Sequence, residues 1–356
     1  MSYVLAFLGF VALIILHEFG HFAVAKAVGM RVERFSLFMG PLLVKFRRGE
    51  TEYGIGPFPL GGYVRITGMN PHEDIPPEVV PRAYYNQKVW KRVVVILAGP
   101  AMNLLIAFVI VWALAMSSGS QAVPTTTVAQ VGAGSPAAHV LRTGDEVVSV
   151  DGVSGSEDAI RNQINTHRCA GAQVNNCVAA TPARVLVKRD GQLVTVNIRP
   201  RYSAADGRQL LGIAFGGKPA NAAQAVPITV SSLWSVTTQT VSTVVRIFEP
   251  QERKQLHSIV YGYTATQESF ATSTTQALWV LALISLSLAI INLFPFLPLD
   301  GGHVFWAVAE KLRGKRIPFE VMERAGVVGF VLILLIFVIG LTNDISTLSG
   351  PGIGIR

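Results

Sequence analysis

The stretch LHEFGHF, from Leu16 to Phe22, places one glutamate and two histidines inside one of the most apolar parts of the chain. It is preceded by VLAFLGFVALII and followed by AVAKAVG, and the whole apolar run extends from Tyr3 to Gly29. Ionisable groups are costly in a hydrocarbon environment, so they persist there when they are paired, bound or functional. The stretch therefore predicts a membrane-spanning helix that carries a functional site.

The composition also indicates a membrane protein. Half of the 356 residues are hydrophobic and only 15% are charged, which gives a mean hydropathy of +0.44. Four apolar runs approach or exceed the roughly 20 residues that a helix needs to cross a bilayer. They lie at 3–28, 93–117, 277–299 and 325–342. The first run lacks the basic leading region and small-residue cleavage site of a signal peptide, so it is expected to remain as a span.

The distribution of lysine and arginine predicts the orientation of the chain. Ten of them fall within residues 29–92, and four more lie in the short loop after the third run. The positive-inside rule places both segments in the cytoplasm, so both termini and residues 118–276 are expected outside. The net charge of +8 is then mostly a matter of topology. It favours contact with anionic membrane lipid and gives no reason to expect nucleic-acid binding.

The long outside segment has a different pattern, with short alternating runs separated by turns such as Asp151-Gly152. Its stretch GSPAAHVLRTGDEVVSVDGV resembles the PDZ domains of bacterial exported proteases. We expect one PDZ-like α+β domain at 118–202, outside the cytoplasm. PDZ domains bind extended peptides at a sheet edge. The alternative is a domain that only blocks access to the membrane part.

The outside segment also holds both cysteines and a helical connector. Cys169 and Cys177 are close enough to form a local disulfide on the oxidising side of a membrane, with a free pair as the alternative. Residues 203–276 are expected to form an amphipathic helical connector. Its apolar face is predicted to include Leu233, Val236, Val241, Val244, Val245 and Phe248.

The polar residues of the opening stretch fit a metal site. His17 and His21 are four residues apart, so on a helix both imidazoles project from one face, as two ligands of one metal do. In HExxH sites the glutamate, here Glu18, is the general base that acts on metal-bound water. The pattern is short and also occurs by chance in soluble sequences. Inside a membrane span it favours a metal, because three buried ionisable groups need a reason to be there.

A hydrolytic zinc site usually has three protein ligands, and Asp300 is the candidate for the third. It follows the third apolar run in INLFPFLPLDGGHVF, where Pro295 and Pro298 break the helix. His17 lies about 14 residues into its run and Asp300 about 22 into its own, so at about 1.5 Å per residue both favour the cytoplasmic half. His303 is the alternative ligand, although its position nearer the basic loop favours an exposed or packing role.

These motifs carry a family resemblance that covers nearly the whole chain. HEFGH in a first span, LAGPAMNLLIA with Asn103 in a second, and NLFPFLPLDGGH in a later one resemble the site-2 proteases, which are intramembrane zinc metalloproteases. The chain is most similar to bacterial members related to the regulator of sigma-E protease, with one PDZ domain. The resemblance implies that His17, His21 and Asp300 bind Zn²⁺ and that Glu18 is the catalytic base.

The resemblance also implies residues that hold substrate. Asn292 and Pro295 match the family's Asn-x-x-Pro element, although the second proline, Pro298, stands one residue later than in many relatives. Residues 42–67 match a membrane-associated β-structure beside the active site, so the tip or edge of that structure is expected at Gly61, Gly62 and Tyr63. A peripheral cytoplasmic hairpin without substrate contact is the alternative.

The expected fold class is an α-helical membrane protein with four transmembrane helices, a membrane-associated β-hairpin region and one extracytoplasmic PDZ-like α+β domain. Spans 1 and 2 fall within 1–117, and spans 3 and 4 with the LDG motif within 277–356. The expected location is the inner (plasma) membrane. The resemblance implies single-span membrane substrates, such as anti-sigma factors pre-cleaved by a site-1 protease or remnant signal peptides. The alternatives are a metal-dependent membrane transporter and a non-catalytic peptide-binding membrane scaffold.

Overall fold

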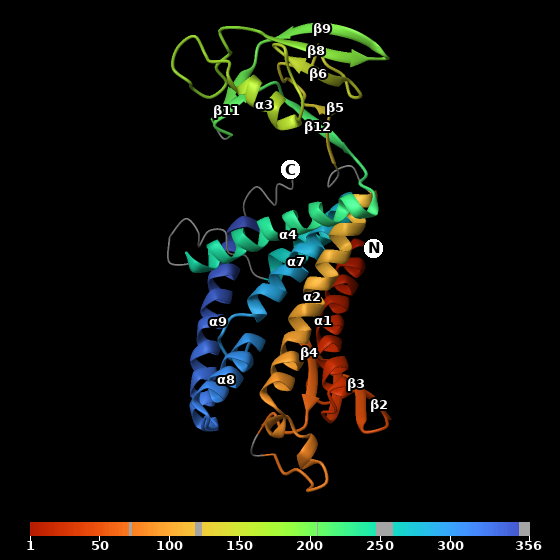
Figure 1. Ribbon diagram of the computed structural model, residues 1–356, viewed down its shortest axis with the longest axis vertical. Coiled ribbons are helices and arrows are strands. Elements are labelled where there is room, and N and C mark those ends of the chain that lie inside the picture. Colours follow the sequence, from red (N-terminus) through yellow and green to blue (C-terminus); the bar gives the residue numbers. More distant parts are fainter. Residues whose placement is uncertain (71–72, 118–122, 205, 247–258, 349–356) are drawn as a thin grey trace. The chain divides into compact units, whose positions relative to one another are not determined.

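The computed structural model describes residues 1–70, 73–117, 123–204, 206–246 and 259–348 (Figure 1). The chain divides into two compact units. A membrane unit combines Met1–Val111 with Val230–Arg356, and a β unit spans Trp112–Thr229. Part of the predicted connector, including Phe248, lies outside the described residues.

The described part of the chain contains α-helices and two short 3₁₀ helices, the latter at Val80–Arg82 and Tyr84–Asn86. Two of the helices, α2 and α4, start in one unit and end in the other. The helices are α1 (Ser2–Ala27), α2 (Val89–Ser117), α3 (Glu157–Asn165), α4 (Ala222–Val245), α6 (Ile259–Thr272), α7 (Thr274–Asn292), α8 (Asp300–Arg313) and α9 (Phe319–Leu348).

Four of these helices are long and apolar enough to cross a membrane, as the sequence predicts. They are Ser2–Ala27, Val89–Ser117, Thr274–Asn292 and Glu320–Ile345. The chain is therefore a multi-pass membrane protein. The predicted third span, 277–299, is wrong at its end, because α7 stops at Asn292. The following residues are just as apolar, but Pro295 and Pro298 lack the amide hydrogen that a helix needs. A turn leads from there into α8.

The first helix shows how an evenly apolar sequence still has an inner face. Within α1 the buried residues recur at helical spacing, and both histidines lie among them. They are Ala6, Leu13, His17, Gly20, His21 and Ala25. Most of the large apolar residues elsewhere on α1 are exposed, as expected of a helix whose outer face contacts lipid.

A four-stranded sheet in the membrane unit follows α1 in the chain. Its strands are β1 (Val32–Met39), β2 (Val44–Arg48), β3 (Thr51–Ile55) and β4 (Phe58–Ile66). Their order is β2-β3-β1-β4, with β1 parallel to β3 and antiparallel to β4. The predicted hairpin region, 42–67, is therefore too small, because it omits the strand in the middle. The sequence of β1, VERFSLFM, mixes charged and apolar residues and lacks a simple alternation. Strand β4 packs along α1 and forms one edge of the sheet.

The β unit is an α+β fold. Its main sheet has the order β12-β5-β6-β8-β9, with β7 paired to β6, and β10 pairs with β11. The strands are β5 (Val123–Val131), β6 (Glu146–Val150), β7 (Val153–Ser154), β8 (Ala183–Arg189), β9 (Gln192–Ile198), β10 (Arg201–Ser203), β11 (Arg208–Leu210) and β12 (Ile213–Lys218). The predicted boundary at Tyr202 falls inside this unit, since β12 pairs with β5. Pairing between strands so distant in sequence leaves no local signal.

Two local features stabilise the β unit. Helix α3 begins at Ser156, whose hydroxyl accepts a hydrogen bond from the Ala159 amide at 3.3 Å and caps the helix. Its apolar face buries Ile160 and Ile164 in the core of the unit. Cys169 and Cys177 are joined by a disulfide, as predicted.

Candidate metal centre

Three side chains from two helices converge in the membrane unit. His17 and His21 lie on the buried face of α1, and Asp300 is the first residue of α8. The Nε2 atom of each histidine lies 3.3 Å from Oδ2 of Asp300. The three ligand atoms all lie within 4.8 Å of one another. The structure therefore brings together the three residues that the sequence singles out as metal ligands.

The two histidine–aspartate separations fit a tetrahedral zinc ion. Zinc binds histidine nitrogen and carboxylate oxygen at about 2.0–2.1 Å, which places tetrahedral ligands about 3.3 Å apart. The Oδ2 atom of Asp300 is buried and has no hydrogen-bond partner among the described residues. A buried carboxylate oxygen without a partner is costly unless a cation binds it. The donor set of two imidazoles and one carboxylate thus suits zinc and leaves a fourth position for water.

The second nitrogen of each histidine contacts helix α2. His21 Nδ1 lies 2.9 Å from the Val95 carbonyl oxygen, so Nδ1 carries the proton and Nε2 is free to bind a metal. His17 Nδ1 lies 3.0 Å from the side-chain nitrogen of Asn103. The role of Val95 could not be predicted from the sequence, because every residue has a backbone carbonyl.

The amide of Asn103 is best placed with its nitrogen and oxygen exchanged. Asn103 is fully buried, and its Oδ1 has no hydrogen-bond partner in the described part of the chain, while its Nδ2 faces His17. Amide orientation is inferred from the hydrogen-bond network. If His17 binds a metal through Nε2, its Nδ1 carries a proton and needs an acceptor. Exchanging the two atoms gives Oδ1 that role. Asn103 then orients His17, a function that the sequence comparison with site-2 proteases left unassigned.

A glycine on α2 allows the two helices to approach closely at the histidines. A Cβ atom added to Gly99 would overlap the His21 ring and lie 2.9 Å from Cε1 of His17. Such a contact is shorter than real Cβ atoms show, so a side chain at this position would displace the imidazoles. Gly20 of α1 meets the Ala98 carbonyl in the same way. Small residues thus allow α1 and α2 to cross at close range, as is common in membranes.

The three ligands line a cavity of about 530 Å³. Glu18 opens onto the same cavity beside its histidine neighbours. The other lining residues are Ile14, Met39, Gly61, Gly62, Tyr63, Val64, Ile66, Met69, Ile96, Leu288, Asn292, Pro298, Leu299 and His303. The apolar members of this set carry no motif, so sequence reasoning missed them.

The edge strand β4 brings the predicted glycines to Glu18. A Cβ atom added to Gly62 would overlap the side chain of Glu18, so only glycine allows this approach. Gly61, Gly62 and Tyr63 all line the cavity, and so does Asn292. Pro295 does not contribute to the described lining, whereas Pro298 does. His303 lies in the cavity wall, but it is not part of the three-ligand cluster.

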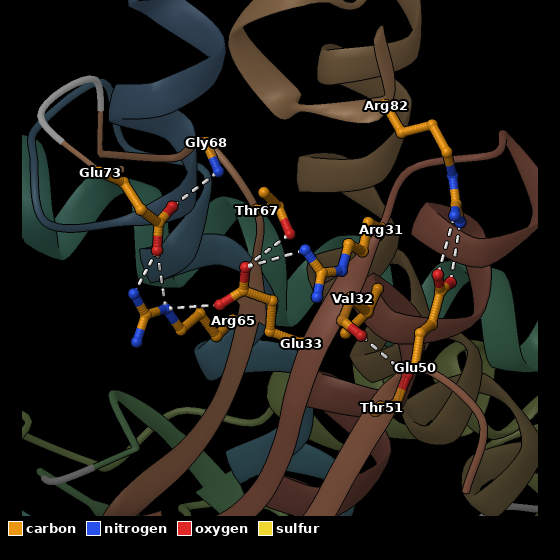
Figure 2. Close-up of polar contacts among 10 residues, drawn as sticks. All are labelled: Arg31, Val32, Glu33, Glu50, Thr51, Arg65, Thr67, Gly68, Glu73 and Arg82. Carbon is orange, nitrogen blue, oxygen red and sulfur yellow. Dashed lines mark hydrogen bonds and ion pairs between the residues drawn. The ribbon is translucent and has the colours of Figure 1, made fainter. Parts of the chain in front are cut away.

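Ion pairs stabilise the C-terminal end of β4 (Figure 2). Arg65 of β4 contacts Glu33 of β1 at 3.1 Å and also pairs with Glu73. Glu73 in turn accepts a hydrogen bond from the Gly68 amide at 2.8 Å. Burial alone would raise the pKa of Glu73, but the Gly68 amide and the Arg65 guanidinium outweigh it and hold this pKa below its usual range. These contacts fix the strand that carries the glycines.

A second pair in the same view connects the sheet to the chain before α2. Arg82 makes two parallel hydrogen bonds of 2.8 Å to the carboxylate of Glu50, in the turn between β2 and β3 (Figure 2). This bidentate bond to Arg82 lowers the pKa of Glu50. Thr51 donates to the Val32 carbonyl at 2.8 Å, which adds a side-chain link between β3 and β1.

A largely buried ion pair joins the two helices that support the ligands. Arg92, in the first turns of α2, donates to Oε2 of Glu310 on α8 at 2.6 Å. Their side chains are only 12% and 14% exposed. Arg92 also lies over the ring of Tyr84, with 5.8 Å between the guanidinium carbon and the ring centroid. Helix α2 contacts both histidines and α8 begins with Asp300, so this pair fixes the two ligand supports relative to each other.

Comparison with known proteins agrees with this site. The model of peptidase family M50 matches residues 5–336. Zinc metalloprotease Rip1 of Mycobacterium tuberculosis is 35% identical, over 84% of this chain and 83% of that protein. Zinc metalloprotease Rip1 of Mycolicibacterium smegmatis is 32% identical, over 90% of this chain and 88% of that protein. The chain therefore belongs to peptidase family M50, the site-2 proteases, and is a zinc metalloendopeptidase of the membrane.

Proposed function

We propose that this intramembrane zinc metalloprotease cleaves the transmembrane segments of single-span membrane proteins. The observation that carries the proposal is the cavity itself. It places Glu18 beside three converged metal ligands and against the free edge of a β-strand. A metal transporter has no need of such an edge, and a scaffold has no need of the partly buried Glu18.

The residue roles follow from their positions. His17, His21 and Asp300 hold the zinc, which when bound lowers the pKa of a water molecule and polarises the substrate carbonyl. Glu18 takes a proton from the attacking water. It then passes that proton to the nitrogen of the leaving amine. The glutamate is adjacent to one ligand in sequence, but it lies outside the ligand cluster and is free to move protons.

The edge of β4 is where substrate is proposed to lie. A transmembrane helix satisfies its amides internally, so its backbone must be unwound before hydrolysis. An edge strand offers unpaired amide and carbonyl groups to the exposed segment. Gly61 and Gly62 leave room for that segment next to Glu18, with Tyr63 and Asn292 on the cavity wall. Pro295 is proposed to act only by ending the helix.

The β unit is proposed to lie outside the cytoplasm and to bind peptide. Its strand β12 is an edge of the sheet, and a cavity of about 170 Å³ lies between α3 and the β11–β12 segment. Arg208 lines that cavity and favours an acidic or carboxyl-terminal ligand, while Arg161, which also lines it, pairs with Glu157. Substrates are accordingly proposed to arrive already shortened by a site-1 protease, at the inner (plasma) membrane.

Substitution of Glu18 tests the proposed chemistry. Glu18→Gln keeps the shape of the side chain and removes the base, while the three ligands are untouched. Cleavage of a single-span substrate by purified protein in liposomes should fall by about 10²–10⁴-fold or more, because the base acts twice. Zinc content, measured by mass spectrometry, should remain near one per chain. Asp300→Ala is the contrasting variant, since it should lose zinc.

Two results would contradict the proposal. One is normal cleavage by the Glu18→Gln protein. The other is wild-type cleavage that a zinc chelator leaves unchanged. Zinc flux across the same liposomes without any cleavage would instead support a transporter.

A further inference from the structure

One histidine of the cavity wall does not belong to the three-ligand cluster. His303 belongs to α8, one turn after Asp300, and it is partly buried in the cavity wall. Three residues along a helix correspond to a rise of about 4.5 Å on nearly the same face. A metal ion bound by Asp300 would therefore lie close to His303.

His303 is not part of the ligand cluster, and no hydrogen bond to a described residue fixes its ring. The ligand cluster is complete without it, since His17, His21 and Asp300 converge alone. Its ring makes no hydrogen bond to any other described residue, and its nitrogens are not among the sealed polar atoms that lack partners. A ring nitrogen is therefore accessible from the cavity. A neutral histidine in such a place can donate a hydrogen bond to a group that occupies the cavity.

Peptide hydrolysis creates a need for such a donor. When water attacks the carbonyl carbon, the C=O π electrons move onto the oxygen, and a water proton passes to Glu18. When the intermediate collapses, the C=O bond re-forms, the C–N bond breaks, and the proton leaves Glu18 for the amine. The oxygen carries negative charge between these steps, and a preorganised donor stabilises it.

We propose that His303 is a catalytic residue that donates a hydrogen bond from its neutral imidazole to the carbonyl oxygen of the scissile bond as it becomes anionic. This inference rests on the proposed protease function. The two other side-chain donors of the cavity outside the ligands, Tyr63 and Asn292, are attached elsewhere. Tyr63 belongs to the substrate edge of β4, and Asn292 ends α7, before the turn that leads to α8. Only His303 shares a helix with a metal ligand.

The test compares two substitutions with a control on the same helix. His303→Leu removes the donor and keeps the bulk, whereas His303→Gln retains a donor amide. Phe305→Leu alters an exposed residue of α8 and serves as the control. Cleavage of one single-span substrate is measured in liposomes, with zinc per chain, kcat and KM determined for each protein.

The leucine variant should lose about 10²–10³-fold in kcat, as does the removal of an oxyanion donor elsewhere. Its KM should stay within about twofold of wild type, because the bond forms mainly as charge develops. Zinc should stay near one per chain. The glutamine variant should recover at least a tenth of the wild-type kcat, and the control should match wild type.

Three outcomes would overturn the inference. Loss of zinc from His303→Leu would make the residue a ligand. An unchanged kcat would make it a packing residue, and a rise in KM alone would make it a substrate-binding residue. Failure of the proposed function is a separate result, because the wild-type protein itself would then show no chelator-sensitive cleavage.

Discussion

At the scale of single residues, the metal centre depends on groups that never touch the metal. Each histidine contacts α2 through its second nitrogen, one through the Val95 carbonyl and one through Asn103. Gly99 keeps the intervening backbone close to both rings. Such outer partners fix the orientation and tautomer of a ligand and so raise its affinity for metal.

Substitution of Asn103 should weaken zinc binding without removing a ligand. Asn103→Leu leaves the Nδ1 proton of His17 without an acceptor, so zinc affinity should fall about 10–100-fold. Asn103→Asp keeps an acceptor oxygen and should bind zinc much more tightly than the leucine variant. Affinity is measured by competition with a chelator of known strength, with the exposed Leu104→Ala as control. Native affinity in Asn103→Leu would show that the amide does not orient His17.

At the scale of elements, α2 and α8 form a frame around the site. Arg92, Val95, Gly99 and Asn103 recur at helical spacing along α2, so one face contacts both the ion pair and the histidines. Asp300 is the first residue of α8, and Glu310 lies in its last turn. The Arg92–Glu310 pair therefore joins α2, which contacts both histidines, to α8, which begins with Asp300.

Breaking the Arg92–Glu310 pair should loosen this frame. Arg92→Met leaves a largely buried carboxylate without its partner, a change that costs roughly 3–5 kcal/mol of stability in buried pairs. Thermal unfolding should occur at lower temperature, and zinc affinity should fall with it. Replacing both residues, in Arg92→Met with Glu310→Leu, should restore much of the loss because no charge is left unpaired. Lys311→Met, beside the pair but exposed, is the control. Equal losses of thermal stability and zinc affinity in the single and double variants would contradict this role of the ion pair.

The sequence was informative about elements where their chemistry is local. Four hydropathic runs predicted the four spans, and the HExxH spacing with Asp300 predicted three candidate ligands, which the structure brings together. Three features were missed because they depend on distant pairing or on backbone geometry. These are the central strand β1, the extension of the β unit to Lys218, and the end of α7 at Asn292. Hydropathy does not distinguish an apolar helix from an apolar turn.

At the scale of the whole molecule, the charge distribution predicts the arrangement in the membrane. The positive-inside rule predicts that the basic segments before α2 and around the end of α8 are cytoplasmic, and it predicts that the β unit lies on the other side. Cys169 and Cys177 are joined by a disulfide, a bond that persists in oxidising compartments. Charge and cysteine chemistry thus favour the same proposed orientation.

Labelling of introduced cysteines tests this orientation with little background, since the two native cysteines are paired. Leu193→Cys in β9 and Leu312→Cys in α8 both replace exposed leucines, at 64% and 84%. On intact cells freed of their outer layers, a membrane-impermeant maleimide should label position 193 and spare position 312. In permeabilised cells, the maleimide should label both positions. The reverse pattern would overturn the topology.

The open edge of β4 has a consequence for how the enzyme chooses among membrane proteins. Two of its central residues, Gly61 and Gly62, have no side chains with which to distinguish one substrate residue from another. A strand edge pairs with backbone, and every protein has the same backbone. We therefore expect selection at this edge, where substrate is proposed to bind, to be a kinetic competition in which the helix that unwinds fastest is cut first. Glycine and proline weaken a helix, so their place in a span matters more than the identity of the residues at the cut.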